Sequence, residues 1–234
     1  QVRLPRDVGV VIVAAGQGRR MGGGVPKQFL PLGGVPLVLR AVRPFVSHPE
    51  VVEVILVLPV EYSAAPPAWL AELRTATLGV VPGGEERTQS VAAGLSALSG
   101  QCEVVLVHDG ARPLVDRETI DRVIAAARTY RAATAAIPLS DSIKQAETGD
   151  PPVITATVPR TGLWQAQTPQ GFVRRVLEDA HAAAKEGGRI ASDDAELVER
   201  LGVQVRIVEG SSGNLKITTS QDLAVAAALL EATG

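Results

Sequence analysis

The sequence predicts an α/β fold built on an open, twisted and mostly parallel sheet with helices on both faces. Strand-like and helix-like segments alternate regularly through residues 8–130. The strand-like segments are continuous, apolar and rich in β-branched residues, which is typical of strands covered on both faces of a parallel sheet. Glycine-rich or acidic positions follow the ends of these segments, where such sheets bind their ligands. We expect residues 1–234 to form one domain.

The first expected strand, residues 8–15, is an uninterrupted apolar run that ends in a glycine-rich loop at residues 16–24. A helix is expected next at residues 37–46, where apolar residues recur at helical spacing despite Pro44. The remaining elements of this half are strands at residues 51–58, 78–81 and 103–108 and helices at residues 67–76, 86–98 and 116–130. Asp116 is expected to cap the last of these helices.

Residues 133–168 interrupt this alternation. Two strand-like pieces, residues 133–138 and 153–158, are separated by a polar turn at residues 149–152, and no amphipathic helix lies between them. This pattern predicts a protruding β-arm at about residues 137–160. An isolated hairpin is barely stable in water, so the arm indicates a dimer. Beyond it we expect helices at residues 172–185, 193–200 and 220–232 and a strand at residues 203–208.

Composition excludes several classes of protein. The net charge is −2 and the pI is about 6.0, which does not fit a nucleic-acid-binding surface. The longest uncharged apolar run, near residues 8–18, is too short to cross a membrane. The single cysteine, Cys102, excludes an intrachain disulfide framework and favours a cytoplasmic protein. A phosphate-binding protein of this charge must concentrate its cations locally.

The loop at residues 16–24 can bring backbone amides close to an anion, because glycine accepts conformations with positive φ. Arg19, Arg20 and Lys27 add positive charge, although a solvated turn with surface cations would look the same. A P-loop does not fit, since no serine or threonine follows Lys27. A dinucleotide fingerprint does not fit either, because Met21 stands where its third glycine should be. An NAD-dependent oxidoreductase is therefore disfavoured.

The loop instead resembles the A-A-G-x-G-x-R-M and P-K pattern of nucleotidyltransferases that activate sugars and alditols. The matching residues are 14–21 (AAGQGRRM) and 26–27 (PK). Five later segments resemble, in the same order, the 2-C-methyl-D-erythritol 4-phosphate cytidylyltransferase family. They are residues 83–91 (GGEERTQSV), 107–113 (VHDGARP), 139–144 (LSDSIK), 160–169 (RTGLWQAQTP) and 214–218 (NLKIT). Six ordered segments between residues 8 and 232 make the resemblance specific.

This resemblance implies a Rossmann-like sheet with an extended β-arm in a homodimer. It also implies transfer of a cytidylyl group from CTP to 2-C-methyl-D-erythritol 4-phosphate, with release of pyrophosphate, in the non-mevalonate route to isoprenoid precursors. Mg²⁺ would be held chiefly by the phosphates of the nucleotide. The attacking group is a phosphate oxygen that is already anionic at neutral pH, so the protein needs no general base, and positioning and cations carry the catalysis.

The resemblance also assigns roles to the residues that match the motifs. Four cations are expected to be catalytic: Arg20 and Lys27 at the triphosphate, and Arg160 and Lys216 at the phosphate of the acceptor. The nucleotide would contact Ala14, Ala15, Gly16, Gly18, Arg19, Gly84, Glu85 and Ser90. The acceptor would contact Asp109, Arg112, Ser142, Thr168 and Ser192. Because Ser142 and Arg160 lie on the expected arm, they would serve the site of the partner subunit.

Some assignments stay open at this point. Asp109 could contact the metal directly as well as the acceptor. Arg112 could be a structural ion pair with Asp109 or Asp116 rather than an acceptor ligand. His108 is expected to form structural hydrogen bonds, and His48 and His181 are expected to face solvent.

Two alternative functions also remain. A ribitol 5-phosphate cytidylyltransferase would share the loop, the base site and the arm, and would differ only around the acceptor. A non-catalytic nucleotide-binding protein is the alternative from another class, and it would be expected to lose Lys27 or Arg20, both of which are present.

Overall fold

A seven-stranded sheet forms the centre of the protein in the computed structural model, which describes residues 5–16, 25–71, 77–188 and 190–233. The strand order is β11-β7-β10-β6-β1-β4-β5. The strands are β1 (Val8–Val13), β4 (Val51–Leu58), β5 (Leu78–Pro82), β6 (Val104–Asp109), β7 (Ala132–Pro138), β10 (Trp164–Val173) and β11 (Arg206–Glu209). β10 runs antiparallel to both of its neighbours, and the remaining pairs in the sheet are parallel. The prediction of a mostly parallel sheet is therefore confirmed.

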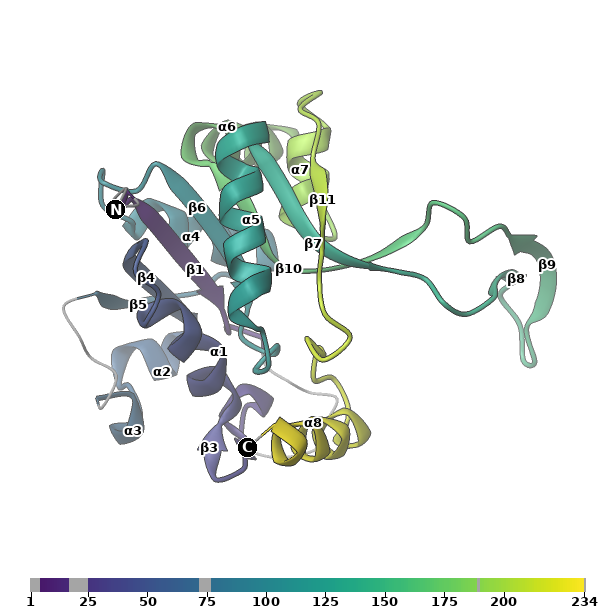
Figure 1. Ribbon diagram of the computed structural model, residues 1–234, viewed down its shortest axis with the longest axis horizontal. Coiled ribbons are helices and arrows are strands. Elements are labelled where there is room, and N and C mark those ends of the chain that lie inside the picture. The colour runs from purple at the N-terminus through teal and green to yellow at the C-terminus, as the bar shows by residue number, and fades with distance from the viewer. Residues whose placement is uncertain (1–4, 17–24, 72–76, 189, 234) are drawn as a thin grey trace.

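Helices cover both faces of this sheet, as Figure 1 shows. They are α1 (Leu37–Val46), α2 (Val60–Ala64), α3 (Ala68–Ala71), α4 (Arg87–Ala97), α5 (Arg117–Tyr130), α6 (Arg174–Gly187), α7 (Asp194–Glu199) and α8 (Ser220–Thr233). A short helical turn, η2 (Lys27–Phe29), and a small hairpin of β2 (Pro31–Leu32) and β3 (Val35–Pro36) precede α1. None of the helices in the described ranges is long and apolar enough to cross a membrane.

The apolar run of β1 is explained by burial on both sides. Val10 and Ile12 pack in one core with residues of α1 and α5, whereas Val11 packs in a second core with residues of α4, α6 and α7. Successive side chains of a strand point to opposite faces, so a strand at the centre of such a sheet must be apolar at every position. Gly94 of α4 allows one of these helices to approach closely, because a Cβ at that position would overlap Val11. The two cores hold the carboxyl ends of β1, β4 and β6 in register.

Most expected elements are found, some with shifted ends. α1 and β4 have the predicted bounds, and the Asp116 carboxylate caps α5 by accepting a hydrogen bond from the Thr119 amide at 2.6 Å. β1 ends two residues earlier than expected, and β11 begins at Arg206 rather than at residue 203. The helix expected at residues 67–76 is seen at Ala68–Ala71, and residues 72–76 lie outside the described part.

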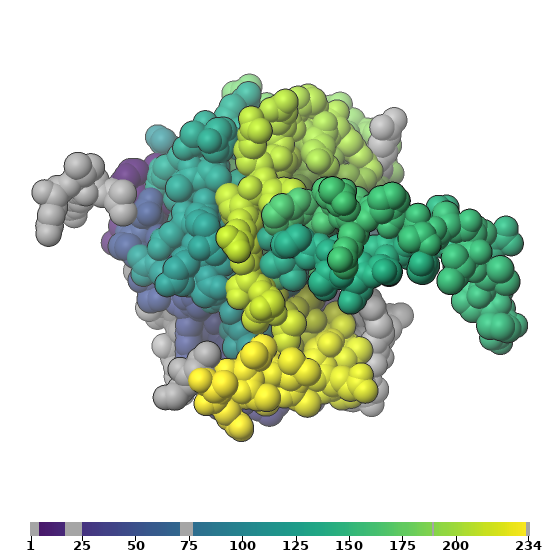
Figure 2. Space-filling view, turned by 45° about the vertical axis from the view of Figure 1, so that its right-hand side comes forward, coloured from purple at the N-terminus to yellow at the C-terminus, as the bar shows by residue number. Residues whose placement is uncertain are grey.

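The pairing expected for the arm is wrong in one respect. The hairpin is formed by β8 (Ile143–Glu147) and β9 (Val153–Val158), and β7 belongs to the central sheet instead. β10, which the sequence pattern did not predict, inserts between β6 and β7 and leads directly into α6. The two ends of the hairpin therefore connect to β7 and β10, which pair with each other in the central sheet. Figures 1 and 2 show it projecting far from the body of the protein.

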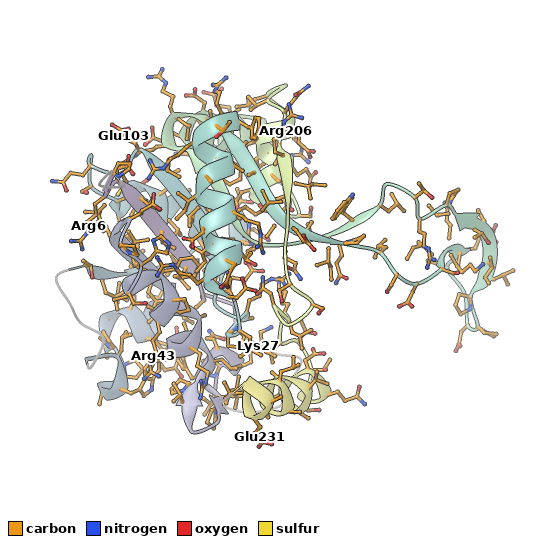
Figure 3. The ribbon with its side chains drawn as sticks, viewed as in Figure 1. Arg6, Lys27, Arg43, Glu103, Arg206 and Glu231 are labelled. Carbon is orange, nitrogen blue, oxygen red and sulfur yellow. The ribbon has the colours of Figure 1, made fainter. Side chains whose placement is uncertain are left out.

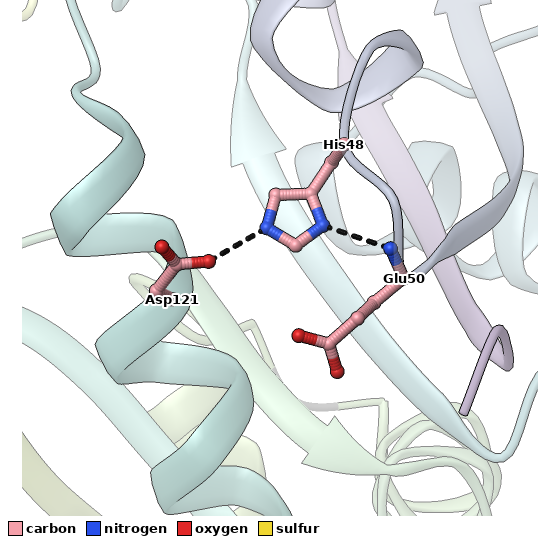
Figure 4. A group of neighbouring side chains, drawn as sticks. All are labelled: His48, Glu50 and Asp121. Carbon is pink, nitrogen blue, oxygen red and sulfur yellow. Dashed lines mark hydrogen bonds and ion pairs between the residues drawn. The ribbon is translucent and has the colours of Figure 1, made fainter. Parts of the chain in front are cut away.

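His48 is buried rather than solvent-facing as expected, with 2% of its surface exposed. Its Nε2 lies 2.8 Å from the Asp121 carboxylate and its Nδ1 accepts a hydrogen bond from the Glu50 amide at 3.2 Å (Figure 4). The Glu50 carboxylate in turn is 2.8 Å from Arg128, which also binds Asp7 at 2.7 Å. This polar cluster connects α5 to the amino ends of β1 and β4. Asp109 lies at the opposite, carboxyl end of the parallel strands.

Candidate active site

A pocket of about 330 Å³ opens at the carboxyl ends of β1, β5 and β6. Parallel strands converge there, so residues from distant parts of the chain share one wall. The lining residues are Val13, Ala14, Ala15, Gly16, Lys27, Gln28, Gly84, Glu85, Glu86, Arg87, Ser90, Asp109, Ala111 and Lys216. This set brings together most of the nucleotide contacts expected from the sequence with two of the expected catalytic cations and Asp109.

Gln28 holds the chain that leaves β1. Its side chain is buried, and its Nε2 donates to the carbonyl oxygens of Ala14 and Gly16 at 2.6 and 3.0 Å. The Ala14 amide donates to the Val57 carbonyl of β4 at 2.9 Å. The backbone of residues 14–16 is therefore fixed from both sides, which preorganises one wall of the pocket. Gln28 was not among the site residues expected from the sequence.

The turn at Gly83 and Gly84 forms the facing wall. The Gly84 amide donates to the Ser90 hydroxyl at 3.1 Å, and that hydroxyl lies 3.2 Å from the Glu86 carbonyl, to which it can donate. A Cβ at Gly83 would overlap both Ala15 and the Ser90 hydroxyl, so only glycine allows the turn to approach β1 so closely. Ser90 thus holds the turn at Gly84 in place. Its expected role at the nucleotide would be carried by this turn, which lines the pocket.

Asp109 lies at the end of β6 among three cations. The Lys216 ammonium is 3.0 Å and the Arg112 Nε 3.8 Å from its Oδ2, while Arg87 Nη2 is 3.4 Å from its Oδ1. Burial alone would raise the pKa of the Asp109 carboxyl, but the charges of Arg87, Lys216 and Arg112 outweigh burial and hold that pKa well below its ordinary range. Asp109 is therefore an ionised hydrogen-bond acceptor at any physiological pH.

A buried network behind Asp109 fixes its backbone. The Asp109 amide donates to the Thr168 hydroxyl at 3.0 Å, so the hydroxyl proton of Thr168 is directed to His108 Nδ1 at 2.9 Å. His108 Nε2 is then the protonated nitrogen and donates to the Arg112 carbonyl at 3.0 Å. Burial lowers the pKa of His108 to about 4, which keeps the ring neutral. The prediction of structural hydrogen bonds for His108 is confirmed.

The segment before α8 closes the pocket from the third side. The Ile217 amide donates to the Ala111 carbonyl at 2.8 Å, and Arg112 Nη1 donates to the Asn214 carbonyl at 2.7 Å. The Lys27 ammonium donates to the Ile217 carbonyl at 3.0 Å, and Figure 3 shows Lys27 beside the chain that leads into α8. Lys27 and Lys216 consequently reach the same pocket although they are far apart in the sequence.

Nearly the whole chain matches one family of known proteins. The sequence profile described as 2-C-methyl-D-erythritol 4-phosphate cytidylyltransferase (IspD) covers residues 8–232. The chain belongs to this family. It is therefore an enzyme of the nucleotidyltransferase class, and the resemblance inferred from the six sequence segments is confirmed.

Individual relatives agree with this assignment. The chain is 42% identical over 224 residues to 2-C-methyl-D-erythritol 4-phosphate cytidylyltransferase of Bacillus licheniformis, covering 95% of both chains. It is 44% identical over 229 residues to the enzyme of the same name from Symbiobacterium thermophilum, covering 97% of this chain and 94% of the relative. The crystal structure of that enzyme from Thermus thermophilus superimposes with a TM-score of 0.81 at 39% identity, covering 96% of this chain and 99% of the other.

Some of the expected site residues do not line this pocket, and others lie outside the described part of the chain. Ser142 and Arg160 are exposed on the arm and do not line the pocket of their own chain. Ser192 is also exposed, and its hydroxyl is 2.8 Å from the Glu196 carboxylate. Thr168 is buried behind Asp109 rather than on the pocket wall. Gly18, Arg19 and Arg20 fall outside the described residues.

Arg112 forms the ion pair with Asp109 that the sequence left open, and it also lines a second pocket. It is buried, lies 3.8 Å from Asp109, and is anchored by the Asn214 carbonyl, while its Nε has no hydrogen-bond partner among the described residues. It also lines a second pocket of about 370 Å³, which adjoins the first through Lys216 and is lined further by Gln165, Gln167 and Asn214. The ion pair with Asp109 therefore does not prevent Arg112 from facing a ligand in this neighbouring pocket.

The described carboxylates at the pocket do not form a metal cage. Within the described ranges, the group of three histidine or acidic side chains close enough to share one ion is His48, Glu50 and Asp121, at the other edge of the sheet (Figure 4). At the pocket, Asp109 can offer one carboxylate, and cations surround it. This arrangement fits a divalent cation that arrives with the nucleotide and takes most of its ligands from phosphate oxygens.

Proposed function

We propose that the protein transfers the cytidylyl group of CTP to the phosphate of 2-C-methyl-D-erythritol 4-phosphate and releases pyrophosphate. In the metabolism of the cell this reaction would serve the non-mevalonate synthesis of isoprenoid precursors. Membership of the family supports the reaction. The structural observation that carries the proposal is the meeting, in one pocket, of a narrow backbone turn, two lysines and an ionised aspartate: Gly84, Lys27, Lys216 and Asp109.

The backbone walls suit the nucleoside. Fixed donors and acceptors at residues 14–16 and at the Gly84 turn would read the edge of the cytosine and the ribose. Because Gln28 and Ser90 hold these two segments, the walls need little rearrangement when CTP binds. Glu85 is exposed at the rim of the turn and would contact the nucleotide mainly through its backbone.

The lysines suit the phosphates. An oxygen of the acceptor phosphate would attack the α-phosphorus of CTP, and the bond from that phosphorus to the bridging oxygen of the pyrophosphate would break. Negative charge then builds up on the α-phosphoryl oxygens and on the leaving group, where Lys27 can stabilise it. Mg²⁺ bound with the nucleotide would neutralise further phosphate charge. No protein base is needed, because the attacking oxygen carries no proton at neutral pH.

Asp109 and Lys216 suit the acceptor. Asp109 is ionised and held on both oxygens, so it can accept hydrogen bonds from the hydroxyl groups of a polyol. The ammonium of Lys216 lies between the two adjoining pockets and would attract the acceptor phosphate. Arg112, which lines the second pocket together with Lys216, would add positive charge to that pocket.

The arm suits a dimer in which each subunit completes the site of the other. The hairpin of β8 and β9 is almost wholly exposed in the isolated chain and carries exposed apolar residues such as Val153 and Ile154, which are 66% and 60% exposed. Arg160 and Ser142 at its base would reach the acceptor of the partner. CTP as the donor substrate and the single free cysteine, Cys102, favour action in the cytoplasm.

The proposal is tested by measuring pyrophosphate release with CTP and Mg²⁺, offering 2-C-methyl-D-erythritol 4-phosphate and ribitol 5-phosphate in parallel. We expect turnover with the first and at most weak turnover with the second. A preference for ribitol 5-phosphate would retain the nucleotide site and overturn the assignment of the acceptor. Release with neither, in folded protein that binds CTP, would overturn the proposed reaction.

A further inference from the structure

Arg87 occupies the pocket wall between the nucleotide turn and Asp109. It is the first residue of α4 and follows Glu85 and Glu86 directly. Its Nη2 lies 3.4 Å from Asp109 Oδ1, and its Nη1 donates to Asp194 Oδ2 at 2.7 Å. The sequence motif that contains this arginine assigned it no role. In the structure, its guanidinium bridges two carboxylates from two different elements.

The second carboxylate, Asp194, is supported from behind. Its side chain is 1% exposed, and its Oδ1 lies 2.9 Å from His181 Nε2. Burial would raise the pKa of the Asp194 carboxyl, but the hydrogen bond from His181 and the charge of Arg87 outweigh burial and lower it. His181 was expected to face solvent, yet only 7% of it is exposed. Because Asp194 is charged, His181 Nε2 must be the donor in this pair.

These contacts form a continuous row from α6 to β6: His181, Asp194, Arg87 and Asp109. A buried carboxylate without a cation is strongly unfavourable, so Asp194 fixes where the guanidinium of Arg87 lies. The planar guanidinium then presents its other nitrogen to Asp109 in a set direction. Its separate nitrogens let the guanidinium contact both carboxylates at once.

Arg87 also makes a contribution at Asp109 that the other two cations do not make. Lys216 and Arg112 both approach Oδ2 of Asp109, and Arg87 approaches Oδ1. Contacts at one oxygen restrict the rotation of a carboxylate only in part, and a contact at the second oxygen fixes the orientation of its plane further. We propose that Arg87, held by Asp194 and His181, is a positioning residue that orients Asp109 toward the acceptor.

This inference rests on the proposed function, since it assigns the acceptor to Asp109. The competing explanation is that Arg87 serves only to neutralise the buried charge of Asp194. The two explanations predict the same loss of stability for Arg87→Met, so that variant alone does not separate them. They differ for the double variant Arg87→Met with Asp194→Asn, in which the charge that needs a cation is gone and the amide can still accept from His181.

The experiment compares wild type, Arg87→Met, Asp194→Asn and the double variant. We expect the Tm to fall in Arg87→Met and to recover toward wild type in the double variant. The KM for the acceptor should be raised on the order of tenfold in both, as for the loss of one charge-assisted hydrogen bond, while the KM for CTP changes less than about twofold. The acceptor used is whichever of methylerythritol 4-phosphate and ribitol 5-phosphate the wild type turns over.

Arg128 supplies the matched control. It bridges two carboxylates in the same way, Asp7 and Glu50, at the edge of the sheet away from the pocket. Arg128→Met should lower the Tm and leave both KM values unchanged. A wild-type KM for the acceptor in the stable double variant would overturn the inference, as would an equal rise in both KM values. Failure of the wild type to turn over either acceptor would instead overturn the proposed function.

Discussion

The Lys27 ammonium donates to the carbonyl oxygen of Ile217 at 3.0 Å, across a separation of 190 residues. This bond ties the loop that follows β1 to the segment that precedes α8, and the neighbour of Ile217 is Lys216. This side-chain contact helps to place the two lysines near each other, and Lys216 is also held by its ion pair with Asp109 at 3.0 Å. Both lie at the pocket where the charge of the phosphates would develop.

Lys27→Ala should reduce kcat on the order of a hundredfold or more, with a modest rise in the Kd for CTP. The reason is that a fixed cation stabilises the transition state more than the bound substrate. Steady-state pyrophosphate release and calorimetric titration with CTP measure the two effects. Lys185→Ala, an exposed position on α6, is the control and should behave as wild type. Intact turnover in Lys27→Ala would contradict the mechanism.

Gln28→Leu should weaken CTP binding and lower the Tm, because the buried amide that bridges Ala14 and Gly16 would be lost and two carbonyl groups would lose their donor. A cost of about 1–3 kcal/mol in the free energy of unfolding is expected for such a change. Chemical denaturation and titration with CTP provide the measurements. Gln204→Leu, at an exposed position before β11, should leave CTP binding unchanged. Normal CTP affinity in Gln28→Leu would show that this wall does not contact the nucleotide.

Asp109→Asn should lower the Tm at neutral pH, because three cations lose their common counter-charge. The pKa of Asp109 is lowered in the folded state, so its contribution is complete above the ordinary value of 3.8 and is lost as the pH falls toward the folded-state pKa. The difference in Tm between wild type and variant should thus be constant from about pH 7 to pH 5 and should shrink below about pH 4.

Thermal melts across this range measure that difference. Glu231→Gln, at an exposed position on α8, is the control and should melt as wild type. A difference that stays constant or grows as the pH falls would mean that the three cations do not hold Asp109 in its charged form.

Mixing Arg160→Ala with Lys27→Ala should restore part of the activity that each variant lacks alone. In a hybrid dimer, one of the two sites would combine an intact arm with an intact pocket and regain function. Activity of the mixture, with subunit exchange verified by mass spectrometry, is the measurement. If exchange occurs and no activity returns, the arm does not complete the site of the partner.

The local elements were predictable because their signals are local. The apolar period of residues 37–46 and the β-branched run of residues 51–58 define α1 and β4 with the bounds seen in the structure. Asp116 was predictable as a cap because its side chain satisfies an amide only three residues away. In the same way, the expected pocket residues Ala14, Gly84 and Asp109 lie at strand ends, which parallel topology brings to one edge.

Long-range pairing was not predictable in the same way. The sequence pattern paired β7 with β9, but in the structure β7 pairs with β10, which inserts antiparallel between β6 and β7. No local feature of these segments indicates which of the two strands pairs with β7. His48 and His181 look like surface residues of helical segments until the carboxylates of Asp121 and Asp194 come into contact with them. Burial of a polar side chain depends on a partner from another element.

The sequence alone determined the family, the alternating elements and most of the residue types at the pocket, because motifs and periodicity are properties of neighbouring positions. Only the tertiary structure decided that Gln28 fixes the wall after β1, that Thr168 lies behind Asp109, and that Arg87 joins Asp109 to Asp194. Each of these contacts joins residues that are separated along the chain and meet only when the strands align. Hydrogen bonds and ion pairs act over a few ångströms, so their partners are known only once the fold has brought them together.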